Sequence, residues 1–246
     1  MAPVLEIVGL RKRFGGLPAV DGVSLAVAEG ERRLLLGPNG AGKTTVFNLI
    51  TGELSRDAGT VRLFGRAVAR LRPDRCAHLG LARTYQIITL FPRNTIIHNV
   101  ALALLGLSPA RWNPLTDIKH QGHLIEHGRA ALERVGLAHI AERPLAQTSY
   151  GERRRVEIAM ALAQNPKVLL LDEPFAGLSI DERRDVQKCL MAIPRDVTMV
   201  MIEHNMDVAL EFAERITLLH FGEVIVEGNR AEVVADPRTR EVYLGH

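Results

Sequence analysis

A glycine-rich segment near the start of the chain has the composition and spacing that hold phosphate groups. It follows the pattern G-x-x-x-x-G-K-T and consists of Gly37, Pro38, Asn39, Gly40, Ala41, Gly42, Lys43 and Thr44. Glycines let backbone N–H groups turn inward toward an anion, and the start of a following helix adds a favourable field for negative charge. Lys43 is expected to reach the β- and γ-phosphates of a nucleotide, and the Thr44 hydroxyl is expected to bind Mg²⁺. The alternative, a glycine-rich turn with a surface lysine, is disfavoured by the strand pattern at 33–36 and the helix pattern at 45–51.

Two adjacent acids form a second group of candidate functional residues. Asp172 and Glu173 follow the apolar run 168–171, which places them at the carboxyl end of a buried strand, where open α/β sheets bind their ligands. Neighbouring residues of a strand point to opposite sides, so the two acids are expected to have different roles. Asp172 suits the coordination of Mg²⁺, and Glu173 suits orienting and deprotonating an attacking water. A strand that merely ends in solvated acids is the alternative, which the phosphate-binding segment in the same chain disfavours.

The segments that must position these groups fall into two regions of different pattern. Short β-type runs punctuated by Gly or Pro open the chain, at residues 5–8, 23–27, 33–36 and 60–64. These runs predict a small, mostly antiparallel lobe. From residue 168 onward, apolar strands alternate with helical segments, the strands at 168–172, 197–203 and 216–220 and the helices at 181–193 and 206–215. Such alternation predicts a parallel sheet with helices on both faces.

Between residues 89 and 146 there is no good strand pattern. Apolar residues recur at helical spacing in 99–105 and 124–135, and the centre at 108–116 is loop-like because it contains Pro109 and Pro114. The sequence therefore predicts an α/β protein with a helical insert.

The bulk composition sets limits on the class of protein. The chain has 246 residues, of which 47% are hydrophobic and 24% charged, as is ordinary for a globular protein. Its 31 basic and 28 acidic residues leave a formal charge of +3, too small a bias to favour nucleic acid as a partner. Cys76 and Cys189 lie far apart, so neither a disulfide framework nor a zinc site is predicted. No apolar run approaches the roughly 20 residues that span a bilayer, so any membrane role is expected to come through other chains.

Kinases, GTPases, helicases and transporters all combine a phosphate-binding segment with an acid at the end of a strand. The residues just before the predicted strand 168–172 distinguish between these families. They are Thr148, Ser149, Tyr150, Gly151, Glu152 and Arg153, and they resemble the LSGGQ signature of the ABC ATPases. The resemblance covers nearly the whole chain and rests on six ordered motifs. It implies a P-loop NTPase (RecA-like) core with a mainly parallel sheet, an N-terminal antiparallel β lobe and an inserted helical subdomain. Residues 1–86 and 151–246 would form the core with its antiparallel lobe, and residues 87–150 the helical subdomain that ends at the signature.

The resemblance also implies roles for single residues. Phe14 stands at the position that stacks on adenine, Gln86 at the glutamine that senses Mg²⁺ and contacts the membrane subunit, and His204 at the switch histidine. Taken alone, Phe14 is also explained as a core aromatic, Gln86 as a surface amide and His204 as a satisfied polar residue. Thr45 joins the nucleotide-binding set. The catalytic set is then Glu173, His204 and Gln86, and the metal set is Thr44, Gln86 and Asp172.

The signature itself is expected to face another chain. Ser149, Tyr150, Gly151 and Glu152 would contact the nucleotide of a partner subunit, because a small hydroxyl residue and a glycine at a helix start expose N–H donors to an anion. Ser149 can cap a helix at 152–163 at the same time.

This sequence departs from the family pattern at several positions. Thr148 replaces the leucine that opens the signature, Tyr150 replaces its first glycine, and Glu152 stands for its glutamine. Ser179 stands where the segment after the acidic pair usually ends in Asp. The basic run at 153–155 is interpreted as a solvated helix face rather than a nucleic-acid patch.

Within the family, two branches share features with this chain. Residues 82–86, the insert at 107–121 and the ends at 236–238 and 243–245 are similar to the subunits that energise uptake of branched-chain amino acids and related amides. Residues 151–159 are also similar to the ATPase of the lipopolysaccharide exporter, and the insert favours the importer. A non-transport ABC ATPase acting on ribosomes or DNA and a P-loop kinase are further alternatives. The single cassette without a long coiled coil disfavours the first of these two, and the signature disfavours the second.

The resemblance implies a set of ligands and partners. ATP and Mg²⁺ are the expected cofactors. The expected partners are a second ABC ATPase subunit in a homodimer or heterodimer, transmembrane permease subunits and, indirectly, a substrate-binding protein, with no nucleic acid. The chain would then lie peripherally on the cytoplasmic face of the inner membrane.

Overall fold

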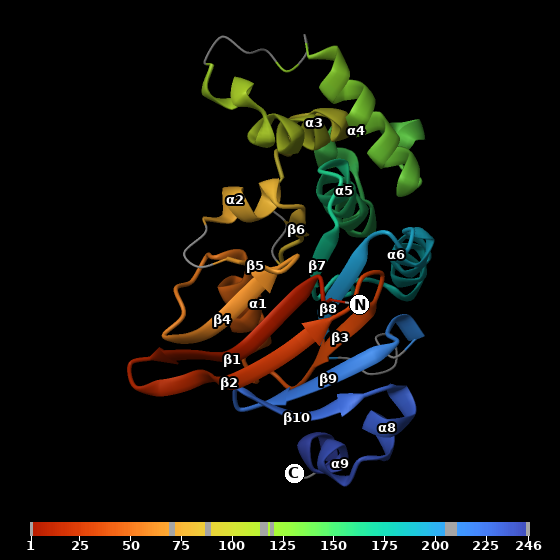
Figure 1. Ribbon diagram of the computed structural model, residues 1–246. Coiled ribbons are helices and arrows are strands. Elements are labelled where there is room, and N and C mark those ends of the chain that lie inside the picture. Colours follow the sequence, from red (N-terminus) through yellow and green to blue (C-terminus); the bar gives the residue numbers. More distant parts are fainter. Residues whose placement is uncertain are drawn as a thin grey trace.

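The computed structural model describes residues 2–68, 72–86, 90–113, 118, 121–204 and 211–244. Helices from the middle of the chain lie at the top of the molecule in Figure 1, two β-sheets lie below them, and the C-terminal helices lie at the bottom. Most of the expected helix at 206–215 falls outside the described residues, as does Gly245. Among the residues that are described, no helix is both long and apolar enough to cross a membrane.

A four-stranded antiparallel sheet forms the lobe at the start of the chain. Its strands are β1 (Leu5–Phe14), β2 (Leu17–Val27), β4 (Ala58–Leu63) and β5 (Arg66–Ala67), in the order β2-β1-β4-β5. This confirms the predicted antiparallel lobe, with one difference. The run at 33–36 was grouped with the lobe, and that grouping is wrong because its strand pairs in parallel with two strands of the second sheet.

The second sheet has six strands in the order β10-β9-β3-β8-β7-β6. They are β3 (Arg32–Leu36), β6 (Leu81–Arg83), β7 (Val168–Asp172), β8 (Thr198–Glu203), β9 (Arg215–His220) and β10 (Glu223–Gly228). Only β10, an edge strand joined to β9 by a tight turn, pairs antiparallel. The parallel strands therefore end at one edge, which brings the phosphate-binding segment after β3 next to the acids after β7.

Alternating side chains of this sheet enter two separate hydrophobic cores. Leu34, Leu169 and Met199 lie in the core shared with the large helices, whereas Leu35 and Leu170 lie in the core shared with the antiparallel lobe. All five are fully buried, as the period of two in a strand covered on both faces requires. The same alternation directs Asp172 to the side of Leu170, beneath the phosphate-binding segment.

The helices cover both faces and the upper end of the sheet. They are α1 (Lys43–Thr51), α2 (Pro73–His78), α3 (Ile96–Leu107), α4 (Gly122–Arg134), α5 (Tyr150–Ala163), α6 (Ile180–Ala192), α8 (Arg230–Ala235) and α9 (Pro237–Leu244). Short 3-10 turns occupy Pro109–Trp112, Ala138–Ile140 and Leu145–Gln147. The first of them lies within the segment that was expected to be a loop. The predicted helices at 45–51, 99–105, 124–135, 152–163 and 181–193 are confirmed with shifted ends, whereas α2, α8 and α9 were not predicted.

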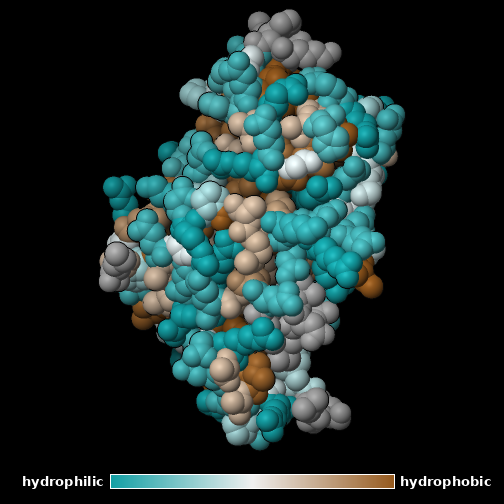
Figure 2. Space-filling view, turned by 90° about the vertical axis from the view of Figure 1, so that its right-hand side faces the viewer, coloured by the Kyte–Doolittle hydropathy of each residue, from teal (hydrophilic) through white to brown (hydrophobic). Residues whose placement is uncertain are grey.

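The middle of the chain forms a helical layer on top of the core. Helices α3, α4 and α5 pack on one another, and Gly128 of α4 allows a close approach to Ile97 and Val100 of α3. Helix α5 therefore joins the layer although it follows the predicted boundary at residue 150. The face in Figure 2, which is the right-hand side of Figure 1, is mostly hydrophilic with small, scattered hydrophobic groups.

Candidate functional site

The phosphate-binding segment forms a tight loop between β3 and α1. Gly40 and Gly42 have φ angles of 82° and 97°, in the left-handed region that favours glycine. A Cβ on Gly42 would collide with the carbonyl oxygen of Ala19 in β2. The antiparallel lobe therefore packs directly on this loop. Thr44 is exposed at the start of α1, with Thr45 partly buried behind it.

Lys43 is folded back into the loop. Its side chain is only 5% exposed, and Nζ donates to the carbonyl oxygens of Gly37 at 2.7 Å and Pro38 at 3.0 Å. Burial lowers the pKa of the ammonium, and the nearby carboxylates of Glu173, Glu203 and Asp172 act in the opposite direction. Lys43 is thus a desolvated cation that faces the acidic end of the sheet, and it suits pairing with phosphate oxygens.

Glu173 has an unusual backbone and two side-chain partners. Its φ of 45° is one of few positive values at non-glycine residues of the described chain. Gln86 Nε2 donates to Glu173 Oε2 at 2.8 Å, and His204 Nδ1 lies 3.4 Å from Glu173 Oε1. Three residues that the sequence predicted separately, from the ends of three strands, therefore meet at one carboxylate.

Glu203 is an acid of this site that the sequence did not predict. It ends β8, is 2% exposed, and accepts hydrogen bonds from the backbone N–H groups of Phe175 and His204, both at 3.3 Å. Burial raises the pKa of its carboxyl group. The signal in the sequence was its place directly before His204 at the end of an apolar run. Glu203 anchors the segment that carries His204 and adds negative charge near Lys43.

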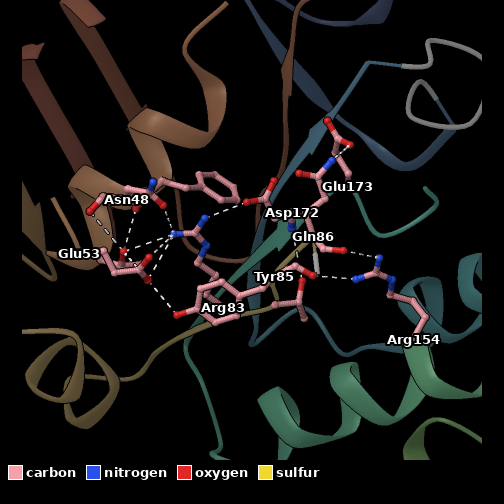
Figure 3. A network of polar contacts seen from close by, with 11 residues as sticks. Asn48, Glu53, Arg83, Tyr85, Gln86, Arg154, Asp172 and Glu173 are labelled. Atoms are coloured by element: carbon pink, nitrogen blue, oxygen red, sulfur yellow. Dashed lines mark hydrogen bonds and ion pairs between the residues drawn. The ribbon is translucent and has the colours of Figure 1, made fainter. Parts of the chain in front are cut away.

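Asp172 is held on one side by a buried arginine (Figure 3). Arg83 Nη2 donates to Asp172 Oδ2 at 2.8 Å, and both side chains are almost fully buried. The backbone N–H of Asp172 donates to Thr84 Oγ1 at 3.3 Å. Burial raises the pKa of Asp172, and the bond to Arg83 opposes this shift. Asp172 Oδ1 is buried and has no hydrogen-bond partner within the described chain. An unpartnered carboxylate oxygen of this kind suits a hard cation such as Mg²⁺.

Arg83 connects Asp172 with the far end of α1. Its Nη1 donates to Asn48 Oδ1 at 2.7 Å and lies 3.4 Å from Glu53 Oε1. The guanidinium stacks on Tyr85 at 4.9 Å from the ring centroid, and the Tyr85 hydroxyl donates to Glu53 at 2.8 Å. Burial, with the hydrogen bond to Glu53, raises the pKa of Tyr85 to about 12. Figure 3 shows this continuous network from Glu53 to Asp172. From the sequence, only Gln86 in this segment received a site role, because Arg83 lies on a strand of three residues, too short to show a pattern.

Arg154 corrects the interpretation of the basic run at 153–155 as a solvated face. Its side chain is fully buried, and Nη1 donates to Glu157 Oε2 at 2.7 Å and to the carbonyl oxygen of Tyr85 at 2.8 Å. Nη2 donates to the carbonyl oxygen of Gln86 at 3.2 Å. Burial raises the pKa of Glu157, and its bond to Arg154 opposes the shift. Helix α5 is therefore hydrogen-bonded to the backbone that carries Gln86.

Phe14 lies at the end of β1 and is 48% exposed, with Lys12 Nζ 5.6 Å from the ring centroid. The alternative that Phe14 is a core aromatic is therefore wrong. An exposed ring on the lobe that packs on the phosphate-binding loop is available for stacking.

The signature residues lie at the start of α5 and form a separate group of backbone and hydroxyl donors. Ser149 caps the helix, as predicted, and forms a reciprocal capping box with Glu152. The N–H of Gly151 donates to Glu182 Oε1 at 2.8 Å. Ser179, which stands where the family has Asp, caps α6. Within the described chain, no hydrogen bond of Ser149 or Gly151 reaches Lys43, Asp172 or Glu173.

Comparison with known proteins gives consistent matches. A family model described as ABC transporter matches residues 20–176. BraF of Pseudomonas aeruginosa, a high-affinity branched-chain amino acid transport ATP-binding protein, is 36% identical over 255 residues, which cover 99% of this chain and 98% of BraF. LivG of Salmonella typhimurium has the same description and is 35% identical over 250 residues, which cover 99% and 98% of the two chains.

Solved structures show the same fold. The ADP conformation of MJ1267, an ATP-binding cassette of an ABC transporter, superposes with a TM-score of 0.87 at 31% identity and covers 100% of both chains. A dimeric post-hydrolysis state of the cassette MJ0796 bound to ADP and Pi superposes with a TM-score of 0.76 at 26% identity, and it covers 92% of this chain and 98% of that one.

Proposed function

The chain belongs to the ABC transporter family and is an ATPase, and from this premise we propose that it works in a pair of ATPase subunits to drive uptake of branched-chain amino acids or related amides. The relatives BraF and LivG are named for branched-chain amino acid transport. The observation that supports the pairing is that the chain carries two anion-binding groups that do not meet. Lys43 and its loop form one, and the N–H groups at Ser149 and Gly151 form the other. A signature that cannot reach its own loop serves the nucleotide of a second subunit.

The metal position in this proposal follows from Asp172. Among the described residues, its Oδ1 is buried without a hydrogen-bond partner, while Arg83 holds Oδ2, so one oxygen of a fixed carboxylate is left for the metal. Thr44 would supply a hydroxyl oxygen and Gln86 an amide oxygen to the same Mg²⁺. Bound Mg²⁺ neutralises charge on the β- and γ-phosphates.

Glu173 is the proposed base. Its two oxygens contact Gln86 and His204, so the carboxylate is oriented by residues that follow two other strands, β6 and β8. The carboxylate would orient the attacking water and accept its proton, and Lys43 would stabilise charge on the γ-phosphate. Arg154 donates to the carbonyl oxygens of Tyr85 and Gln86, so the position of Gln86 depends on α5.

The permease partner is proposed to bind the groove beside Gln86. Residues of the Arg83–Tyr85 segment, α3 and α5 line this groove, among them Tyr85, Ala103 and Gln164. A short helix of a permease seated there would place the chain on the cytoplasmic face of the membrane. A substrate-binding protein would act through the permeases.

Mixed dimers test the shared site. Lys43→Ala disables one phosphate-binding loop, and Gly151→Asp places a carboxylate at the signature. Each variant paired with itself has two defective sites and should be inactive. In a mixed dimer one site combines both defects and the other is intact, so ATPase activity should partly return. Verified mixed dimers without activity would contradict the shared site.

The groove is tested with Ala103→Arg, which adds a bulky charge where the permease helix would sit. Transport by the reconstituted complex should be lost while the ATPase activity of the isolated chain is unchanged. Glu126→Arg, on an exposed part of α4, is the matched control and should leave both unchanged. Equal transport by Ala103→Arg and Glu126→Arg would place the permease elsewhere.

A further inference from the structure

A carboxylate of the chain itself takes up the donors at the start of the signature helix. Glu182, in the first turn of α6, accepts the N–H of Gly151 at 2.8 Å through Oε1. Its Oε2 accepts the N–H of Ser179 at 3.1 Å and the Ser179 hydroxyl at 2.9 Å. Its side chain lies so close to Gly151 that a Cβ there would come within 2.6 Å of Glu182 Cγ. The glycine of the signature thus provides the space for this carboxylate.

These bonds keep Glu182 ionised. The N–H of Gly151 contributes most, followed by the N–H and hydroxyl of Ser179, and together they lower the pKa of Glu182 to about 2. The side chain is partly exposed and borders a shallow pocket with Ser149, Glu152 and Arg155. An anion reaching this pocket from outside therefore meets a negative charge that already occupies the N–H of Gly151.

The contact also joins the starts of two helices. The ring of Tyr150 packs against Gly177, where a Cβ would lie 3.4 Å from Tyr150 Cε1. Gly177 belongs to the segment between Glu173 and α6. Helices α5 and α6 pack along each other as well. Glu182 is therefore placed where the signature meets the segment that follows the proposed base.

We propose that Glu182 is a positioning residue that holds the signature in the single chain by taking the place of a phosphate, and that it must leave Gly151 when the partner's ATP binds. The inference rests on the proposed function, in which Ser149 and Gly151 bind the partner's nucleotide. One N–H cannot serve a carboxylate and a phosphate at full strength, and two anions at this distance repel each other. ATP replaces Glu182 because its γ-phosphate carries more charge. Glu182 thereby raises the ATP concentration at which the subunits pair.

The test measures ATP-driven pairing of the full chain. In the Glu173→Gln background, where hydrolysis is blocked, Mg-ATP is titrated and dimer formation is followed by sedimentation. Glu182→Ala should lower the ATP concentration for half-maximal pairing about tenfold, equivalent to roughly 1.4 kcal/mol. Glu182→Gln should lower it less, because the neutral amide oxygen still accepts from Gly151.

Glu232→Ala is the matched control. Glu232 forms the same reciprocal capping box in α8, where it accepts the N–H of Asn229 at 2.7 Å, and none of its hydrogen bonds within the described chain reaches the signature. The loss of a helix cap is thus reproduced without the loss of the Gly151 contact, and the half-maximal ATP concentration should not change. Amide hydrogen exchange in the nucleotide-free chain gives a second measurement, in which Gly151 should exchange faster in Glu182→Ala than in the parent.

The outcomes separate the two proposals. If the parent pairs with ATP but Glu182→Ala leaves the half-maximal concentration unchanged or raises it, Glu182 does not compete with ATP and this inference is wrong, while the proposed function stands. Equal exchange of Gly151 in both chains would also refute it. If the Glu173→Gln parent does not pair at any ATP concentration, the shared site fails and the inference fails with it.

Discussion

The phosphate-binding loop and the signature both present donors that suit an anion, but they differ in how the chain surrounds them. Around the loop, the side chains of Lys43, Asp172 and Arg83 are nearly fully buried, Arg83 pairs with Asp172, and the charge of Asp172 acts on Lys43. At the signature, Ser149 is exposed and Gly151 donates to a carboxylate of the same chain. The first region is buried within the fold, whereas the second lies at the surface with a carboxylate of the same chain bound to it. On the proposed function, the signature is the half of the site that depends on a partner.

Lys43→Ala should have the largest effect, because it removes the buried cation of the self-contained region. ATP binding should weaken strongly and turnover should be abolished, since the backbone donors alone cannot neutralise the phosphates. Equilibrium ATP binding and phosphate release measure the two effects. Lys188→Ala, an exposed lysine of α6, should leave both unchanged. Normal turnover by Lys43→Ala would show that the phosphate-binding loop does not depend on its buried cation.

Glu173→Gln should separate binding from chemistry. The amide keeps the shape of the side chain but cannot accept a proton, so hydrolysis should fall by roughly a hundredfold to ten-thousandfold while ATP still binds. Single-turnover hydrolysis and ATP titration measure this split. A variant that hydrolyses at the normal rate would assign the base to another residue, for which Glu203 is the nearest candidate.

Arg83→Met should show how far the buried region depends on its arginine. Mg-dependent ATP affinity should fall by about tenfold to a hundredfold, as for other residues that orient a metal ligand. The free energy of unfolding should decrease by roughly 3–5 kcal/mol, because Asp172 is left as an unpaired buried charge. ATP titration with Mg²⁺ and with a chelator, together with urea denaturation, measures both.

Arg62→Met is the control for Arg83→Met, because Arg62 pairs with Glu6 at 3.0 Å on the surface of the antiparallel lobe. Its free energy of unfolding should change by no more than about 1 kcal/mol. If ATP affinity in Arg83→Met differs between Mg²⁺ and chelator by as much as in the parent chain, the role of Arg83 is only structural.

Ser149→Ala should have the smallest effect on the single chain and should act mainly on pairing. Loss of the helix cap should lower the free energy of unfolding by about 1 kcal/mol. ATP affinity of the monomer should be unchanged, while ATP-driven pairing in the Glu173→Gln background weakens. Asn229→Ala, which removes the cap of α8, should reproduce the stability change and not the change in pairing. A fall in monomer ATP affinity would mean that the two regions are not independent.

The sequence predicted best where one short segment carries the whole signal. The loop around Lys43 and the acids after β7 are of this kind, because strand, turn and helix patterns agree on a few adjacent residues. The contacts between distant segments were not predictable. Arg83 lies on a strand too short to show a period, and Arg154 looks like one member of a solvated basic run. Glu182 was not singled out in the sequence, and nothing in its local pattern points across to Gly151.

The backbone of Glu173 has a consequence for the evolution of this chain. Its φ of 45° is a conformation that glycine adopts at less cost than any other residue, by roughly 1 kcal/mol. A random search for thermostable variants should therefore find Glu173→Gly among its improvements, and on the proposed function such a protein would be more stable but would not hydrolyse ATP. Selection for stability and selection for turnover would then act on this position in opposite directions.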